Sequence, residues 1–157
     1  MTDQQIEHLI NCPKTITQPP RRTLQLNQGH LRNSFEMQSD DGEHTFSAFI
    51  RQNAKFPEGF TIGLKHKDKE GHETTLLRCN GMHGEHSNNS EEHFCDYHIH
   101  IAKAENIIAG LLPEKYAEIT KEYMNLDDAL AYFVVKCNIQ DAYEYFPHLQ
   151  QPRLFEV

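Results

Sequence analysis

The stretch Phe46-Ser47-Ala48-Phe49-Ile50-Arg51 decides the fold class. Its apolar residues recur with a period of two, which is typical of a β-strand with one buried face and one polar face. The turn sequence Asp40-Asp41-Gly42 precedes this strand and Pro57-Glu58-Gly59 follows it, so a hairpin partner is expected on each side. The stretch therefore predicts the middle of an antiparallel meander.

The alternation with a period of two extends outward from Arg22 to Cys79, and a last strand is predicted from 94 to 101. Helical periodicity replaces it toward both ends of the chain. The fold class predicted from these patterns is α+β, an antiparallel β-meander of about five or six strands packed against a few helices. The helices are expected to form a single layer on one face of the sheet.

Three helices are predicted from start and stop signals. Thr2 can cap a short helix that ends before Pro13, and a second helix is expected over 102–112. Asn125 can cap the strongest one, whose apolar face consists of Leu126, Ala129, Leu130, Phe133, Val134 and Cys137.

The length of 157 residues and the absence of a linker predict a single domain over 1–157. Residues 79–94 form a long polar loop, and loops of that length are usually functional or disordered. Residues 141–157 form an aromatic, aperiodic tail that we expect to cover the sheet or to contact a second subunit.

The composition excludes some classes of protein. The net charge of −8 disfavours broad electrostatic capture of nucleic acid, so any nucleic-acid site would need a local positive pocket. The mean hydropathy of −0.70 and the lack of a long apolar run predict no membrane span. The first residues do not resemble a secretion signal, which makes the cytoplasm the expected location. The four cysteines are scattered and are expected to be reduced thiols, mostly buried: Cys12, Cys79, Cys95 and Cys137.

A histidine-rich stretch is the strongest functional signal. Five of the eleven histidines fall between Met82 and Ile101, namely His83, His86, His93, His98 and His100. In an extended strand Asp96, His98 and His100 share one face, whereas Cys95, Tyr97 and Ile99 share the other, apolar face. His98 and His100 would then lie about 7 Å apart. A helix that starts near Ala102 would add free N–H groups close to His100, a favourable place for an anion.

The preceding strand ends in Arg78-Cys79-Asn80-Gly81-Met82-His83. If this strand pairs antiparallel with the histidine strand, its polar groups meet the two histidines. The predicted catalytic residues are therefore His98, His100, Arg78 and His83, with Arg51, Asn53 and Asn80 as predicted substrate-binding residues.

The run Arg78 to His83, followed by His98-Ile99-His100, resembles an uncharacterised bacterial family of small domains of unknown function. This resemblance also takes in residues 49–53, Gly63-Leu64 and the helix over 126–137, so it covers most of the chain. More distantly, Arg-x-Asn-x-x-His followed by His-x-His resembles the TumE-like toxin group of toxin–antitoxin systems. That second resemblance implies a nuclease with RNA as its substrate and an antitoxin-like protein as its partner.

Two hypotheses follow from these residues. The first is a metal-independent phosphodiesterase or ribonuclease-like effector without a cofactor, in which His98 and His100 share acid and base roles and Arg78 stabilises phosphoryl charge. The second is a non-catalytic module that binds an anion, zinc or another divalent metal. Its predicted metal ligands are His83, His98 and His100, with Asp96 or His86 as the fourth. A bland alternative is an interaction domain that forms a homodimer through its aromatic tail.

Overall fold

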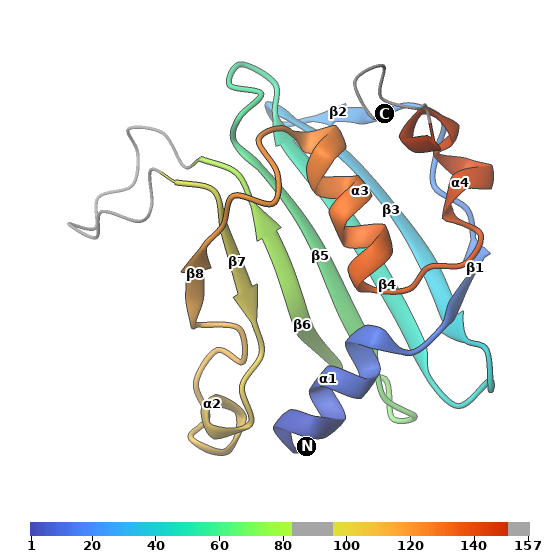
Figure 1. Ribbon diagram of the computed structural model, residues 1–157, viewed down its shortest axis with the longest axis vertical. Coiled ribbons are helices and arrows are strands. Elements are labelled where there is room, and N and C mark those ends of the chain that lie inside the picture. Colours follow the sequence, from blue (N-terminus) through green and yellow to red (C-terminus); the bar gives the residue numbers. More distant parts are fainter. Residues whose placement is uncertain (83–95, 151–157) are drawn as a thin grey trace, which may run out of the picture.

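An antiparallel sheet of eight strands forms the body of the protein in the computed structural model, which describes residues 1–82 and 96–150 (Figure 1). The strands run in the order β1-β3-β4-β5-β6-β7-β8, and β2 pairs with β3 outside this path. Their bounds are β1 Lys14–Gln18, β2 Gln25–Asn27, β3 His30–Ser39, β4 Thr45–Asn53, β5 Phe60–Lys67, β6 Glu73–Asn80, β7 His98–Ile101 and β8 Ala117–Ile119. The predicted α+β class and antiparallel meander are confirmed, whereas the predicted count of five or six strands is too low.

The predicted alternation of buried and less buried side chains along β4 is confirmed. Phe46, Ala48 and Ile50 are buried, and Ala48 and Ile50 pair with Leu64 and Ile62 of β5 to form the centre of the core. The hairpin signals at Asp40-Asp41-Gly42 and Pro57-Glu58-Gly59 lie in the two turns that flank β4.

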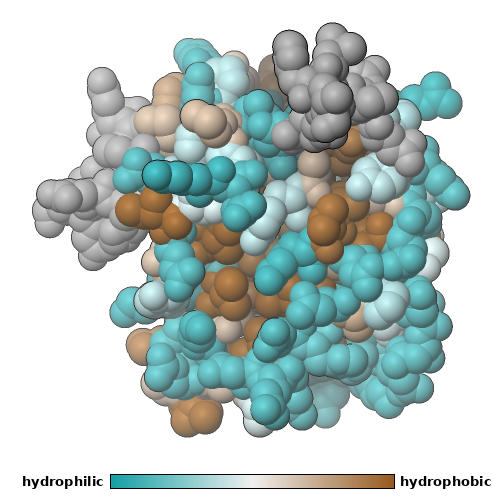
Figure 2. All heavy atoms as spheres, viewed as in Figure 1, coloured by the Kyte–Doolittle hydropathy of each residue, from teal (hydrophilic) through white to brown (hydrophobic). Residues whose placement is uncertain are grey.

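Helices cover one face of this sheet. Figure 1 shows α1 (Asp3–Asn11), α3 (Leu126–Lys136) and α4 (Ala142–Tyr145) on the same side, as predicted. The side chain of Thr2 caps α1, and that of Asn125 caps α3 by accepting from the N–H of Asp128 at 2.8 Å. Figure 2 shows hydrophobic residues gathered over the middle of this face, beside α3.

The second predicted helix is shorter than expected. It is α2, Ala104–Ile108, and the structure places no helix over the rest of the 102–112 range. The N–H of Ala104 donates to Asp3 Oδ1 at 2.7 Å. A carboxylate of the chain itself therefore accepts from the first N–H group of α2.

Two strands were not predicted. The first, β1, lies between Pro13 and Pro19 and is too short to show a clear alternation. The second, β8, has three residues at the sheet edge. Strands of this length depend on their partners rather than on their own pattern. The predicted strand over 94–101 begins only at His98, and its first two residues lie outside the described part of the chain.

The buried side chain of Lys14 joins the C-terminal ends of α1 and α3. Its Nζ donates to the carbonyl oxygens of Ile10, Cys12 and Cys137 at 2.7, 2.9 and 2.8 Å, and lies 4.7 Å from the ring centroid of Phe46. Burial lowers the pKa of Lys14 below its usual value. One ammonium group thus satisfies carbonyls at the ends of α1 and α3.

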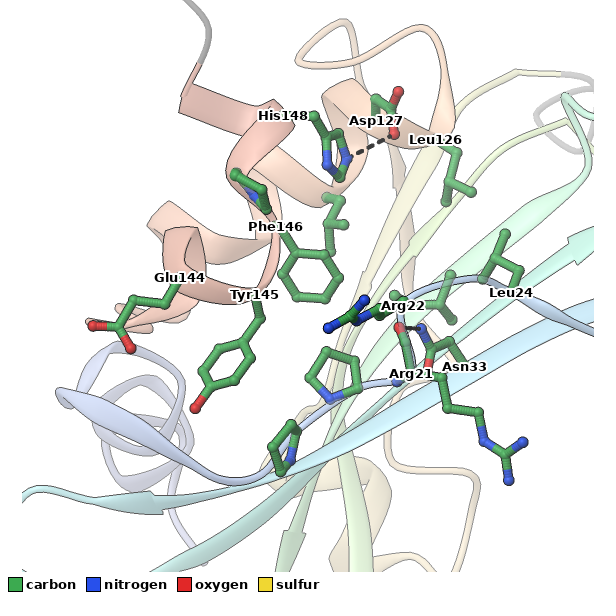
Figure 3. A pocket seen from close by; sticks show the side chains of 15 residues that line it. Arg21, Arg22, Leu24, Asn33, Leu126, Asp127, Glu144, Tyr145, Phe146 and His148 are labelled. Carbon is green, nitrogen blue, oxygen red and sulfur yellow. Dashed lines mark hydrogen bonds and ion pairs between the residues drawn. The ribbon is translucent and has the colours of Figure 1, made fainter.

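The described part of the predicted tail packs on the helix side. Phe146 is buried against Phe35 with ring centroids 5.6 Å apart, and the 3₁₀ helix η3, Pro147–Gln150, follows it. A cavity of about 680 Å³ lies between this segment, α3 and the chain around Pro19. Figure 3 shows Arg22 extending toward the rings of Tyr145 and Phe146 at this cavity. None of the predicted site residues lines it.

Other predictions concern the thiols and the membrane. Three of the four cysteines are buried and free, as predicted: Cys12, Cys79 and Cys137. The fourth, Cys95, lies outside the described residues. In the described part of the chain, no helix combines the length and apolarity that crossing a membrane requires.

Candidate functional site

The pairing of β6 with β7 brings the predicted residues together. The two strands are antiparallel, and the register places Arg78 opposite His100 and Asn80 opposite His98. The sequence predicts this meeting of polar groups on the condition that the two strands pair, and they do. It aligns four polar side chains from two segments about 20 residues apart.

These four side chains lie on the sheet face that the helices do not cover. Arg78 is also opposite Gly63 of β5, and Asn80 is opposite Thr61, whereas Cys79 is opposite Ile62 in the core. Since neighbouring residues of a strand point to opposite faces, Arg78 and Asn80 must lie on the side away from Ile62. The sheet thus separates the apolar core from a polar cluster.

His98 is held at both ring nitrogens and has no exposed surface. Its Nδ1 lies 2.8 Å from the carbonyl oxygen of Asp96, so Nδ1 carries the hydrogen and donates. Its Nε2 lies 3.3 Å from Asn80 Nδ2 and accepts from that amide. These contacts fix the orientation of the ring and suit a positioning role.

His100 is fixed by a segment from beyond β7. Its Nδ1 lies 2.8 Å from the carbonyl oxygen of Glu114 and donates to it, so Nε2 is the nitrogen without a hydrogen in the neutral ring. The rings of His98 and His100 have centroids 5.0 Å apart and lie edge to face at 66°. The predicted proximity of the two histidines is therefore present.

Among residues 1–82 and 96–150, three buried polar atoms around these histidines have no hydrogen-bond partner: Arg78 Nε, Asn80 Oδ1 and Glu114 Oε2. Asn80 is 1% exposed and Glu114 is 4% exposed. A buried polar atom without a partner costs about 1–3 kcal/mol, so such atoms are usually explained by a ligand, an ion or water. Their clustering makes this part of the sheet the candidate site.

Arg78 is the cation at the centre of the cluster. Burial lowers the pKa of its guanidinium, the nearby Glu114 carboxyl opposes this effect, and Arg51 reinforces it. The electrostatic field at Arg78 therefore includes one anion and one further cation from separate strands or loops. Arg78 is thus a partly buried cation with charges of both signs nearby.

Two residues of the site were not predicted. Glu114 lies in the segment between α2 and β8, and nothing in its local sequence distinguishes it from a surface acid. Tyr123 lies on the other side of the sheet, with its hydroxyl 2.9 Å from the carbonyl oxygen of Asn80 and 2.7 Å from that of His98. Burial raises the pKa of Tyr123. Its contacts hold the ends of β6 and β7 together beneath the polar cluster.

Other predicted site residues lie apart from this centre. Arg51 is exposed on β4, opposite Thr61 and on the same sheet face. Asn53 instead stabilises the turn after β4, since its Oδ1 accepts from the N–H groups of Lys55 and Phe56 at 2.9 and 3.1 Å. Asp96 precedes β7 and contributes its backbone carbonyl to His98. The remaining candidates, His83, His86 and His93, lie outside the described residues.

The described members of the predicted metal set do not converge on one point. Over residues 1–82 and 96–150, the single group of three metal-ligating side chains with ligand atoms within 4.8 Å of one another is Asp68, Glu70 and His72. That group is exposed in the turn between β5 and β6, away from His98 and His100.

The comparisons with known proteins give a family and no activity. Residues 1–139 match a family of unknown function, DUF6978, so the chain belongs to that family. No curated protein and no solved structure matches the chain. The family match includes all the described residues of the polar cluster.

Proposed function

We propose that this member of a family of unknown function is a phosphodiesterase of the ribonuclease type, with Arg78, His100 and Glu114 as its working groups. The register of β6 and β7 supports the proposal, since it aligns Arg78 with His100. The observation that carries it is the cluster of buried polar atoms on Arg78, Asn80 and Glu114 that have no partner within the part of the chain that the structure describes.

The chemistry follows from the types of group present. Arg78 binds the phosphate and stabilises the charge that develops on its oxygens. The Glu114 carboxylate takes the proton from the ribose 2′-hydroxyl as its oxygen attacks phosphorus. His100 gives a proton from Nε2 to the 5′-oxygen as the P–O5′ bond breaks. The products are a 2′,3′-cyclic phosphate and a free 5′-hydroxyl, and no outside nucleophile is consumed.

His98 takes a positioning role in this scheme rather than the acid–base role first expected for it. Both of its ring nitrogens are engaged, by the Asp96 carbonyl and by the Asn80 amide. It lies against the His100 ring and keeps the edge-to-face contact. Loss of His98 is therefore expected to disturb the placement of His100 more than the proton transfer itself.

The test is cleavage of a fluorogenic single-stranded RNA and of its all-deoxy counterpart, each with and without chelator. The wild-type chain is expected to cleave only the RNA, with or without chelator. His100→Ala is expected to lower the rate by about 100-fold or more, the usual contribution of general acid–base catalysis. His72→Ala, an exposed histidine in the turn after β5, is the matched control. RNA cleavage retained in folded His100→Ala protein would refute the proposal.

A metal-binding module is the second candidate. His100 donates Nδ1–H to a backbone carbonyl, which is how metal-binding histidines are commonly oriented. Elemental analysis of protein purified without a polyhistidine tag tests this candidate. Stoichiometric zinc, together with a melting temperature that falls in chelator, would favour it over the ribonuclease.

A further inference from the structure

A row of residues crosses the sheet face that lies away from α1, α3 and α4, from the proposed centre toward β3. His100 is opposite Arg78, Arg78 is opposite Gly63, and Gly63 is opposite Phe49. Three strand spacings separate the ends of this row, a span of about 14 Å. The row therefore connects the proposed centre to an aromatic side chain on β4.

Phe49 lies over the backbone of Gly63. A Cβ atom placed on Gly63 would lie 2.2 Å from Cε1 and Cζ of the Phe49 ring, so only glycine leaves room for the ring there. Lys65 Nζ lies 5.3 Å from the ring centroid. The bare strand thus supports a partly exposed aromatic ring on an otherwise polar face.

Cations gather beside this ring. Arg32 of β3 and Arg51 of β4 are directly opposite each other, a pairing of like charges that destabilises a sheet. Among the residues that the structure describes, no ion pair includes Arg32, Arg51 or Arg78. On a chain with net charge −8, such a local excess of positive charge needs a reason.

The face is hollowed next to Phe49. A depression of about 710 Å³ is lined by Phe49 together with Arg21, Arg32 and Arg51, and by no acidic residue. An aromatic floor with three guanidinium groups around it complements a nucleotide, which has a flat base and an anionic phosphate. The depression continues the row that leads to His100.

We propose that this row and depression form a binding track for single-stranded RNA, which rests on the proposed function and specifies its substrate. The scissile phosphate binds at Arg78, an unpaired base stacks on Phe49 in place of the Lys65 ammonium, and further phosphates contact Arg51 and Arg32. A double helix does not fit this arrangement because its bases are already stacked and paired. The track therefore selects a single strand over a double helix, and the 2′-hydroxyl that the proposed reaction uses makes RNA the substrate.

The experiment measures affinity without cleavage. A fluorescein-labelled 12-nucleotide RNA with 2′-O-methyl groups throughout lacks the nucleophile, and its binding is followed by fluorescence anisotropy at several salt concentrations. Phe49→Ala is expected to weaken binding by about 5- to 150-fold, as the loss of one base stack does. Phe49→Leu, which keeps apolar volume at this position, is expected to show a similar loss.

Arg51→Ala tests the electrostatic part of the track. The slope of log K against log salt is expected to decrease in magnitude by about 0.7, the value for one phosphate contact on a single strand. The matched control is Arg22→Ala, since Figure 3 shows Arg22 at the cavity on the helix side. This control is expected to keep the wild-type affinity and slope.

The outcomes separate the two proposals. Unchanged affinity in both Phe49 variants, or a duplex bound as tightly as the single strand, overturns the track whether or not the protein cleaves RNA. Equal affinity for the matching DNA single strand overturns the choice of RNA as the ligand. A chain that binds through Phe49 and Arg51 but cleaves no RNA supports the track and overturns the ribonuclease.

Discussion

At the scale of single residues, Lys14 has the largest expected effect on stability. Lys14→Met removes the ammonium and leaves the carbonyls of Ile10, Cys12 and Cys137 buried without their donor. The free energy of unfolding is expected to fall by about 3 kcal/mol. Urea denaturation measures this loss, with the exposed Lys69→Met as control. Equal denaturation midpoints for Lys14→Met and wild type would contradict the role assigned to Lys14.

His66 predicts a dependence of stability on acid pH. Burial, followed by the nearby His44, lowers the pKa of His66 from 6.5, although Asp68 opposes this shift. As pH falls below about 6.5, the unfolded chain takes up the proton before the folded chain does, so the free energy of unfolding decreases. The free energy of unfolding returns to its full value once the pH is above the pKa of His66 in the unfolded chain.

Melting temperatures between pH 5 and pH 7.5 test this dependence. His66→Gln is expected to melt with a smaller decrease toward pH 5 than the wild type. His72→Gln, at an exposed histidine, is expected to keep the wild-type decrease. Parallel curves for wild type and His66→Gln would show that other groups cause the acid sensitivity.

At the scale of elements, the cap of α3 can be isolated from its packing. Asn125 Oδ1 accepts from the N–H of Asp128, and Asn125 itself is exposed. Asn125→Ala is expected to lower the free energy of unfolding by about 1 kcal/mol, whereas Asn125→Asp keeps an acceptor and the stability. Chemical denaturation of the three proteins measures the difference. A loss of the same size in both variants would mean that the side-chain amide, not the cap, is what α3 requires.

At the scale of the whole molecule, the segment after the family match is part of the core. Phe146 is 7% exposed and packs against Phe35 of β3. Phe146→Ala is expected to cost about 3 kcal/mol, since it leaves a cavity between α4 and the sheet. Tyr145→Ala, at a side chain that is 36% exposed, is expected to cost much less. Thermal unfolding checks both, and a negligible effect of Phe146→Ala would make the segment a dispensable cover.

The parts of this fold that the sequence predicts depend on neighbouring residues. Each of these signals involves residues only a few positions apart in the chain, so a short stretch of sequence is enough to recognise it. They are the alternation around Ala48, the turn at Gly42 and the helix caps Thr2 and Asn125. Strand parity likewise placed His98 and His100 together. These signals were enough to predict the meander and to place Arg78 and Asn80 near His98 and His100.

The parts that were missed depend on contacts far apart in the chain. The Tyr123 hydroxyl meets the carbonyl of Asn80 across 43 positions, and the carbonyl of Glu114 meets His100 across 14. The strands β1 and β8 exist because a partner strand lies beside them. No local pattern encodes such pairings, and only the folded sheet brings these residues to the site.

During synthesis on the ribosome, most of the sheet emerges before the helix that covers its apolar face. The strands through β6 end at Asn80, but α3, which covers the apolar face, ends 56 residues later at Lys136. At the usual pace of translation this delay is about 3 to 11 s. During that interval the emerging chain displays an uncovered apolar surface. We therefore expect a chaperone that holds nascent chains to occupy it until α3 has emerged.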